Sequence, residues 1–218
     1  MNPIRIFQLI KREFTIESRK KSTVAGIFLF TAMTVFLVYK TFNSIKPFEW
    51  NVMFWILILF SGVNAIAKSF IQDGNSSRIH DYTLFNPIEL IFAKLIYNFI
   101  FMASIYLVIF LGFAFFLNNP VKDYNMFLGS SVLGMFGIST IYTFISAISG
   151  HSDGSSLLMS ILALPLTLPI ILLLLRTSAA SMRILQDTSI GNDILLLAGI
   201  DFMCLGVVLL LFKVVWRD

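Results

Sequence analysis

Few residues in this chain have the type and spacing that catalysis or metal binding requires. The two histidines, His80 and His151, have no second histidine or cysteine at ligand spacing, so we expect no metal site. No G-x-x-x-x-G-K-[ST] phosphate loop and no G-x-S-x-G or H-E-x-x-H motif occurs. We therefore predict that the chain is not an enzyme and holds no firmly bound cofactor.

Asp201 is an ionisable residue expected at depth, about eight residues into the last hydrophobic segment. A charged side chain placed there faces the interior of a helix bundle or water, which makes it a functional candidate. The alternative is a plain hydrogen bond to a neighbouring helix, and the sequence leaves both open. Cys204, three residues later, is interpreted as a small packing residue.

Pro165 and Pro169 lie four residues apart, on one helix face, within the uncharged stretch Leu157–Leu175. Each proline removes a backbone donor and frees a carbonyl one turn earlier, at Ile161 and Pro165. A freed carbonyl is costly in lipid, so we expect this face to point at protein or at a polar cavity. We also expect the two prolines to break the helix.

The composition is that of a polytopic all-α membrane protein. Of the 218 residues, 57% are hydrophobic and 13% charged, whereas a soluble domain carries roughly 25% charged residues. Six of the 16 lysines and arginines precede residue 22, where they can meet lipid headgroups. The basic excess therefore predicts a membrane-lipid contact and no nucleic-acid partner.

Six apolar segments are long enough to span a membrane. They are Thr23–Phe42, Trp50–Phe70, Glu89–Leu117, Asn125–Ser149, Leu157–Leu175 and Asp193–Trp216. The lysine and arginine bias places the N-terminus inside, and an even number of spans then places both termini in the cytoplasm. We expect a further short interfacial helix over Thr177–Gln186.

Residues 1–22 are predicted to form a cytoplasmic interfacial helix, because Ile4, Phe7, Ile10 and Phe14 recur at helical spacing among basic residues. A charge cluster that only sets topology is the alternative. In the fourth segment, Ser130 and Gly134 form a small-xxx-small pair, which favours close helix packing within one chain over a dimer contact.

Polar amides and aromatic residues within the segments allow more than one interpretation. Asn64 and Asn98 are expected to bridge helices. The third segment is rich in phenylalanine, which favours a core or lipid-facing role over a path for a flat apolar ligand.

The connection over residues 71–88 opens with the turn signals Asp73-Gly74-Asn75 and continues with a possible short helix that ends at Asn86-Pro87. Gln72-Asp73-Gly74, followed by the run from Leu84 to Ala93-Lys94, resembles the Q/E-D-G … L-x-x-P-x-x-x-x-x-x-A-K pattern of type-2 ABC exporter membrane subunits. In those exporters this segment is the coupling helix that docks on a cytosolic ATPase. The resemblance assigns coupling to Gln72, Asp73, Gly74, Arg78, Ile79 and Tyr82.

Leu157 to Pro169 is similar to the Leu-Leu-Ser-Ile-Leu-x-Leu-Pro-Leu-Thr-x-Pro span of the heme exporter protein B family of cytochrome c maturation. The resemblance implies a single permease domain over residues 1–218, in a bacterial inner membrane. The family's coupling segment continues with Leu-Glu-x-Leu, whereas this chain has Ser77-Arg78-Ile79-His80-Asp81-Tyr82. This difference affects whether the chain could pair with another organism's ATPase.

The same resemblance implies several partners: an ABC ATPase that binds ATP, a heme-handling membrane subunit and a periplasmic heme chaperone, with two copies of this chain. Heme is then a possible cargo, and the output is either heme export or release of heme-loaded chaperone. Two alternatives stay open, a type-2 permease for another hydrophobic cargo such as a lipid or drug, and a non-transporting assembly scaffold. Heme ligation by His80 or His151 is also left open, beside the simpler role of a solvated loop residue.

Overall fold

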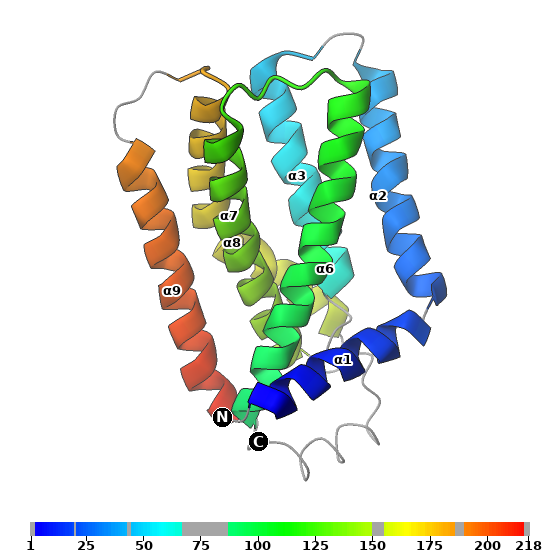
Figure 1. Ribbon diagram of the computed structural model, residues 1–218, viewed down its shortest axis with the longest axis vertical. Helices are drawn as coiled ribbons and strands as arrows, with labels where there is room; N and C mark the ends of the chain where they lie inside the picture. Colours follow the sequence, from blue (N-terminus) through cyan, green and yellow to red (C-terminus); the bar gives the residue numbers. More distant parts are fainter. Residues whose placement is uncertain are drawn as a thin grey trace.

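The computed structural model describes residues 3–19, 21–42, 45–66, 87–149, 155–185 and 190–215. These residues form seven α-helices and no strand (Figure 1), which confirms the all-α prediction. Six of the helices are long and apolar enough to cross a membrane. The chain is therefore a multi-pass membrane protein.

One helix, α1 (Pro3–Arg19), lies across an end of the molecule, and six others run along its long axis (Figure 1). We call the end that carries α1 the basal end, and the end that carries residues 117–123 the distal end. The long helices are α2 (Lys21–Thr41), α3 (Pro47–Ile66), α6 (Pro87–Phe116), α7 (Tyr124–Ser149), α8 (Ser155–Ser181) and α9 (Ile190–Val215).

The six long helices coincide with the six predicted segments, except at the end of α8. The prediction stopped the fifth segment at Leu175 and placed a separate helix over Thr177–Gln186, but α8 continues to Ser181. The end of α8 is held against α3, because Ser178 Oγ donates to Asn51 Oδ1 at 2.7 Å and accepts from Trp55 Nε1 at 2.9 Å. These contacts hold Ser178 within helix α8, so the prediction of a separate interfacial helix was wrong.

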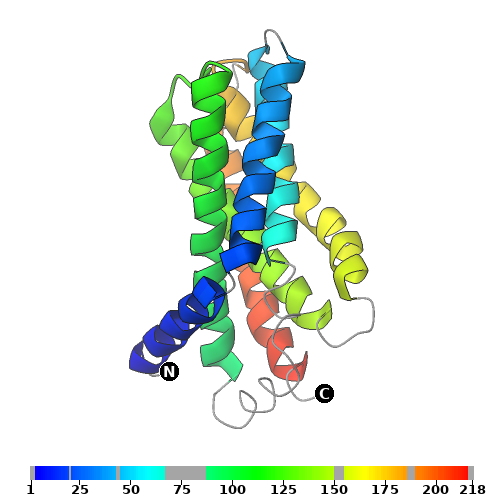
Figure 2. The same cartoon turned by 90° about the vertical axis from the view of Figure 1, so that its right-hand side faces the viewer.

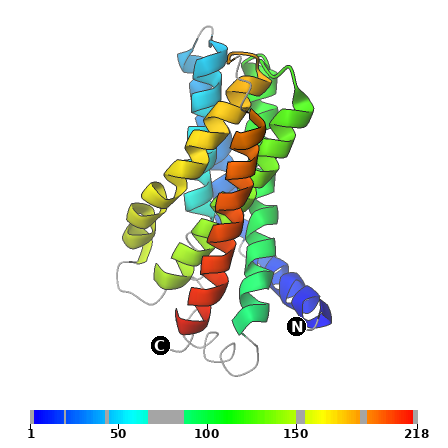
Figure 3. The same cartoon turned by 90° about the vertical axis from the view of Figure 1, so that its left-hand side faces the viewer.

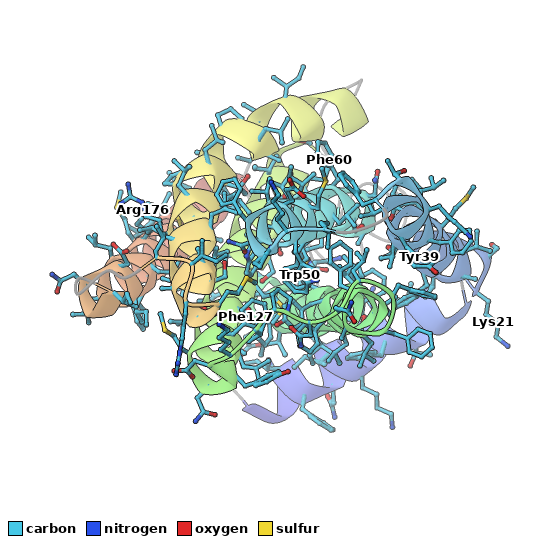
Figure 4. The ribbon with its side chains drawn as sticks, turned by 90° about the horizontal axis from the view of Figure 1, so that it is seen from above. Lys21, Tyr39, Trp50, Phe60, Phe127 and Arg176 are labelled. Carbon is cyan, nitrogen blue, oxygen red and sulfur yellow. The ribbon has the colours of Figure 1, made fainter. Side chains whose placement is uncertain are left out.

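Aromatic side chains fill the centre of the distal half. The rings of Trp50 and Phe54 stack at 4.9 Å between centroids, and Phe113 meets Trp50 edge-on at 5.3 Å. Phe127 closes the group from α7, with its centroid 5.8 Å from that of Phe54. Figure 4, which looks down on the distal end, shows Trp50 and Phe127 within the bundle. Phe113 is thus a core residue, whereas Phe115 is exposed on the outer surface.

Small residues on α7 let two other helices approach it closely. A Cβ added at Gly134 would overlap the side chain of Leu174 on α8, and a Cβ at Gly137 would overlap Asp201 on α9 and Ile170 on α8. Gly134 therefore serves packing within one chain, as the sequence favoured.

Polar side chains join the long helices at several levels of the bundle. Asn98 Nδ2 donates to Thr143 Oγ1 at 2.9 Å, which confirms the predicted bridge between α6 and α7. Tyr142 Oη donates to the Leu59 carbonyl at 3.1 Å and so ties α7 to α3. Asn64, by contrast, is exposed on α3 and bridges nothing within the described chain. Ile56 and Phe60, four and eight residues before Asn64, are also exposed, so the three residues lie on the outward face of α3.

We expect Gly134→Ile to lower the free energy of unfolding by about 1–3 kcal/mol, because the added side chain must displace Leu174. The matched control is Gly129→Ile on the same helix, where a Cβ meets nothing within 4 Å. Thermal unfolding of the detergent-purified variants measures the difference. Equal melting temperatures for the two variants would contradict the close α7–α8 packing.

Candidate functional site

A buried ion pair joins α1 to α6 at the basal end. Lys94 Nζ lies 3.3 Å from Glu13 Oε2, and only 2% of the Lys94 side chain and 11% of the Glu13 side chain are exposed. A charge withdrawn this far from water needs a partner, and replacing either residue takes a charged partner from a side chain that stays buried. We call this pair the basal clamp, since it joins α1 to α6 seven residues after the start of that helix.

Aromatic contacts extend the clamp toward α2. Phe14 of α1 meets Tyr97 of α6 edge-on at 5.0 Å between ring centroids. Tyr97 stacks with Phe101 at 6.0 Å, and Phe101 in turn meets Phe28 of α2 edge-on at 6.0 Å. The start of α6 therefore lies in one connected set of contacts with α1 and α2.

α1 packs on α6 through residues beyond the apolar set Ile4, Phe7, Ile10 and Phe14 that the sequence singled out for the membrane surface. Of that set, Phe7 is 70% exposed and Phe14 is 42% exposed. Leu9, at 2% exposed, is the buried apolar residue, and Glu13 follows it one turn later. Periodicity in apolar residues found the helix but missed that an ion pair selects its packed face.

The predicted coupling residues Gln72, Asp73, Gly74, Arg78, Ile79 and Tyr82 lie outside the described residues, as do His80 and His151. Their roles stay predictions. The structure does describe the two helices that flank the coupling segment. α3 ends at Ile66 and α6 begins at Pro87, both toward the basal end that carries α1 (Figure 2).

Both prolines lie inside α8, which continues through them without a break. The basal half of α8 leans outward from the long axis of the bundle (Figures 2 and 3). The prolines therefore lie in a helix that leans outward without ending, and the prediction of a helix break was wrong.

The proline face of α8 points away from the rest of the chain. Pro165 and Pro169 are exposed, together with Ile161, Leu162 and Leu166. The opposite face carries Ala163 and Thr167, both fully buried. Thr167 Oγ1 donates within the helix to the Ala163 carbonyl at 2.8 Å, so this hydroxyl does not reach the freed carbonyls. The expected protein or polar cavity beside the prolines is not supplied by this chain's described residues.

Asp201 faces the interior of the bundle, as predicted. It is 2% exposed and occupies the space above Gly137 on α7, beside Ile170 on α8. Neither carboxyl oxygen has a hydrogen-bond partner among the described residues. Asp201 is therefore placed where three helices meet, next to the turn of α8 that follows Pro169.

Metal chemistry has no support in the described part of the chain, where no group of three histidine, cysteine or acidic side chains could hold an ion. Cys204 is a free, partly buried cysteine that packs against the core, in keeping with its expected role.

The basal clamp is the feature that sequence reasoning missed. Lys94 was named from the sequence as the last residue of the exporter pattern and was given no partner. Two signals were present: Lys94 falls within an apolar segment, where an ionisable side chain requires a partner, and Glu13 lies in a helix expected at the same membrane surface.

We expect Lys94→Met to release α1 from α6, because the variant loses the ion pair that joins Glu13 to α6. A cysteine placed at buried Leu9, in a Cys204→Ser background, would react with maleimide about tenfold faster or more when α1 detaches. Lys11→Met is the control, since Lys11 is exposed on the same helix. Equal labelling rates in both variants would show that the ion pair does not hold α1.

Two comparisons with known proteins bear on this architecture. The model of one protein family, described as CcmB protein, matches residues 4–214, which is nearly the whole chain. A search of curated proteins found no match.

Proposed function

Because the chain belongs to the CcmB (heme exporter protein B) family, it is a membrane component of an ABC-type heme exporter for cytochrome c maturation, and we propose that it couples ATP hydrolysis by its ATPase partner to events on the opposite side of the membrane. The basal clamp is the observation that carries this proposal. It makes the helix that follows the coupling segment move together with α1.

The ATPase would dock on the segment around Gln72, Asp73 and Gly74, with Arg78, Ile79 and Tyr82 presented to it. This segment joins α3 to α6, so a displacement on ATP binding is applied to the start of α6. Lys94 lies only seven residues after Pro87, and its bond to Glu13 carries the displacement to α1. Rigid-body movement of packed helices is a common way to relay such a signal.

The packed core argues against a path for heme through a single chain. Trp50, Phe54, Phe113 and Phe127 are fully buried against one another across the distal half. A flat ligand of tetrapyrrole size would have to displace several of these rings. Any path for cargo would therefore run between chains. Release of a heme-loaded chaperone at the far side is the second output compatible with this packing.

We propose that two copies of the chain associate through the proline face of α8. The freed carbonyls of Ile161 and Pro165 lie on a face that no described helix of the same chain covers. Backbone carbonyls exposed to lipid are costly, and a second copy would remove them from it. The complex would lie in a bacterial inner membrane with a heme-handling membrane subunit and a periplasmic chaperone, and both termini of this chain would be cytoplasmic.

We expect deletion of the gene in its own host to abolish covalently bound heme in c-type cytochromes while b-type heme is retained. A heme stain of separated membrane proteins measures the first, and difference spectroscopy measures the second. Complementation should restore the stain. A c-type signal that is unchanged by the deletion would overturn the role in cytochrome c maturation and favour another hydrophobic cargo.

We expect Leu166→Cys, in a Cys204→Ser background, to form a disulfide-linked dimer under mild oxidation in native membranes. The control is Leu210→Cys, which is more exposed than Leu166 but lies on α9. Cysteines must approach to Cα distances of roughly 4.4–6.8 Å to pair, so only residues at an interface should react. Equal dimer yields at both positions, or none at Leu166, would contradict the proposed interface.

A further inference from the structure

A cavity of about 290 Å³ opens at the distal end, between the end of α2, the start of α3 and the loop after α6. Its volume is at the lower end of the roughly 300–1,000 Å³ found for small-molecule sites. The lining combines aromatic and polar side chains, among them Tyr39, Phe42, Trp50, Phe116, Asn118 and Asn119. In Figure 4 Trp50 lies near the centre of the bundle and Tyr39 to one side of it on α2.

Trp50, one of the residues that line this cavity, carries an unused hydrogen-bond donor. The residue is 0% exposed, and its Nε1 has no acceptor among the described residues. Trp55, one turn further along α3, differs in that its Nε1 donates to Ser178 Oγ at 2.9 Å. A tryptophan that merely anchors a helix at the membrane interface turns its N–H toward water or headgroups. A buried and unpaired N–H is instead costly, which points to an acceptor supplied from outside the chain.

The rim of the cavity is fixed before any ligand binds. Asn119 Oδ1 accepts from the Val121 backbone N–H at 3.0 Å, and Asn119 Nδ2 donates to Tyr124 Oη at 3.0 Å. The preceding Asn118 has a φ of 55°, a left-handed conformation that asparagine tolerates better than most residues. The loop is thus held open over the cavity by its own hydrogen bonds.

A cation lies beside one of the lining residues. Lys40 is exposed, and its Nζ lies 5.5 Å from the ring centroid of Tyr39 and 5.9 Å from that of Phe36. The cavity is also at the level where α2 and α6 end and α3 begins, which is where the headgroup region of a bilayer meets spanning helices. Apolar rings, a buried donor and a nearby cation therefore occur together at one depth.

We propose that this distal cavity binds an anionic amphiphile. Its oxyanion accepts a hydrogen bond from Trp50 Nε1 and lies near Lys40, while its apolar part packs on Tyr39, Phe42 and Phe116. This chemistry has two sources, a phospholipid of the surrounding leaflet and a carboxylated tetrapyrrole. The proposal does not depend on the coupling role, because no residue of the basal end takes part.

The test is native mass spectrometry of the full-length chain, purified in detergent and titrated with three probes. These are phosphatidylglycerol, phosphatidylcholine with the same acyl chains, and metal-free protoporphyrin IX. The variants are Trp50→Phe, which keeps the ring stack on Phe54 and removes the N–H, and Lys40→Gln, which removes the cation beside Tyr39. The matched control is Trp55→Phe, which loses the same group elsewhere.

We expect wild type and Trp55→Phe to retain one anionic probe. Trp50→Phe should bind that probe about tenfold more weakly, because it loses a hydrogen bond to a charged group. Lys40→Gln should weaken the same probe without affecting phosphatidylcholine. A Trp50 dependence seen with phosphatidylglycerol assigns the site to lipid, and one seen with protoporphyrin assigns it to a tetrapyrrole. Binding that is equal in all variants, or absent for both anionic probes, would overturn the proposal. If Trp50→Phe does not fold, the Lys40→Gln variant decides, and unchanged binding by that variant would overturn the proposal.

Discussion

The close approach of α8 and α9 to α7 is the contact on which the rest of the bundle depends. In a membrane, lipid tails are as apolar as the side chains, so helix association relies on tight van der Waals contact and on interhelical hydrogen bonds. Gly134 and Gly137 provide the first by leaving room for Leu174 and Asp201. Asn98 and Tyr142 provide the second, toward α6 and α3. α7 is accordingly the most buried of the six spanning helices in the described chain.

The two ends of the bundle are built differently, and the difference fits the proposed coupling role. The distal half is held by stacked aromatic rings and by the contacts among Asn51, Trp55 and Ser178. At the basal end, by contrast, the contacts of α1 within the described chain include the Glu13–Lys94 ion pair and the ring contact of Phe14 with Tyr97, and α8 leans away from the axis (Figures 2 and 3). A force applied near the coupling segment would thus shift the basal helices against a rigid distal half.

Hydrophobicity and length were sufficient to predict the all-α class and the six spanning helices, because these follow from the cost of exposing backbone to lipid. The inward position of Asp201 and the bridge made by Asn98 followed from the same cost. The helix at the start of the chain was predicted from the spacing of its apolar residues. The packed face of α1 could not be predicted, since it depends on a pairing of Glu13 with a residue 81 positions away. The continuity of α8 likewise depends on contacts of Ser178 with α3, which no local pattern encodes. The predicted roles of the coupling residues fall outside the described part of the chain.

The distance along the chain between Glu13 and Lys94 also has a consequence for biosynthesis. α1 leaves the ribosome first, but its partner is made 81 residues later, after two complete spans. Until α6 has been inserted, α1 must wait at the membrane surface with Leu9 and Glu13 uncovered. Docking of α1 is therefore a late event that reports correct insertion of the third span. A nascent chain whose α6 fails to insert would keep Leu9 and Glu13 exposed to chaperones and to membrane proteases.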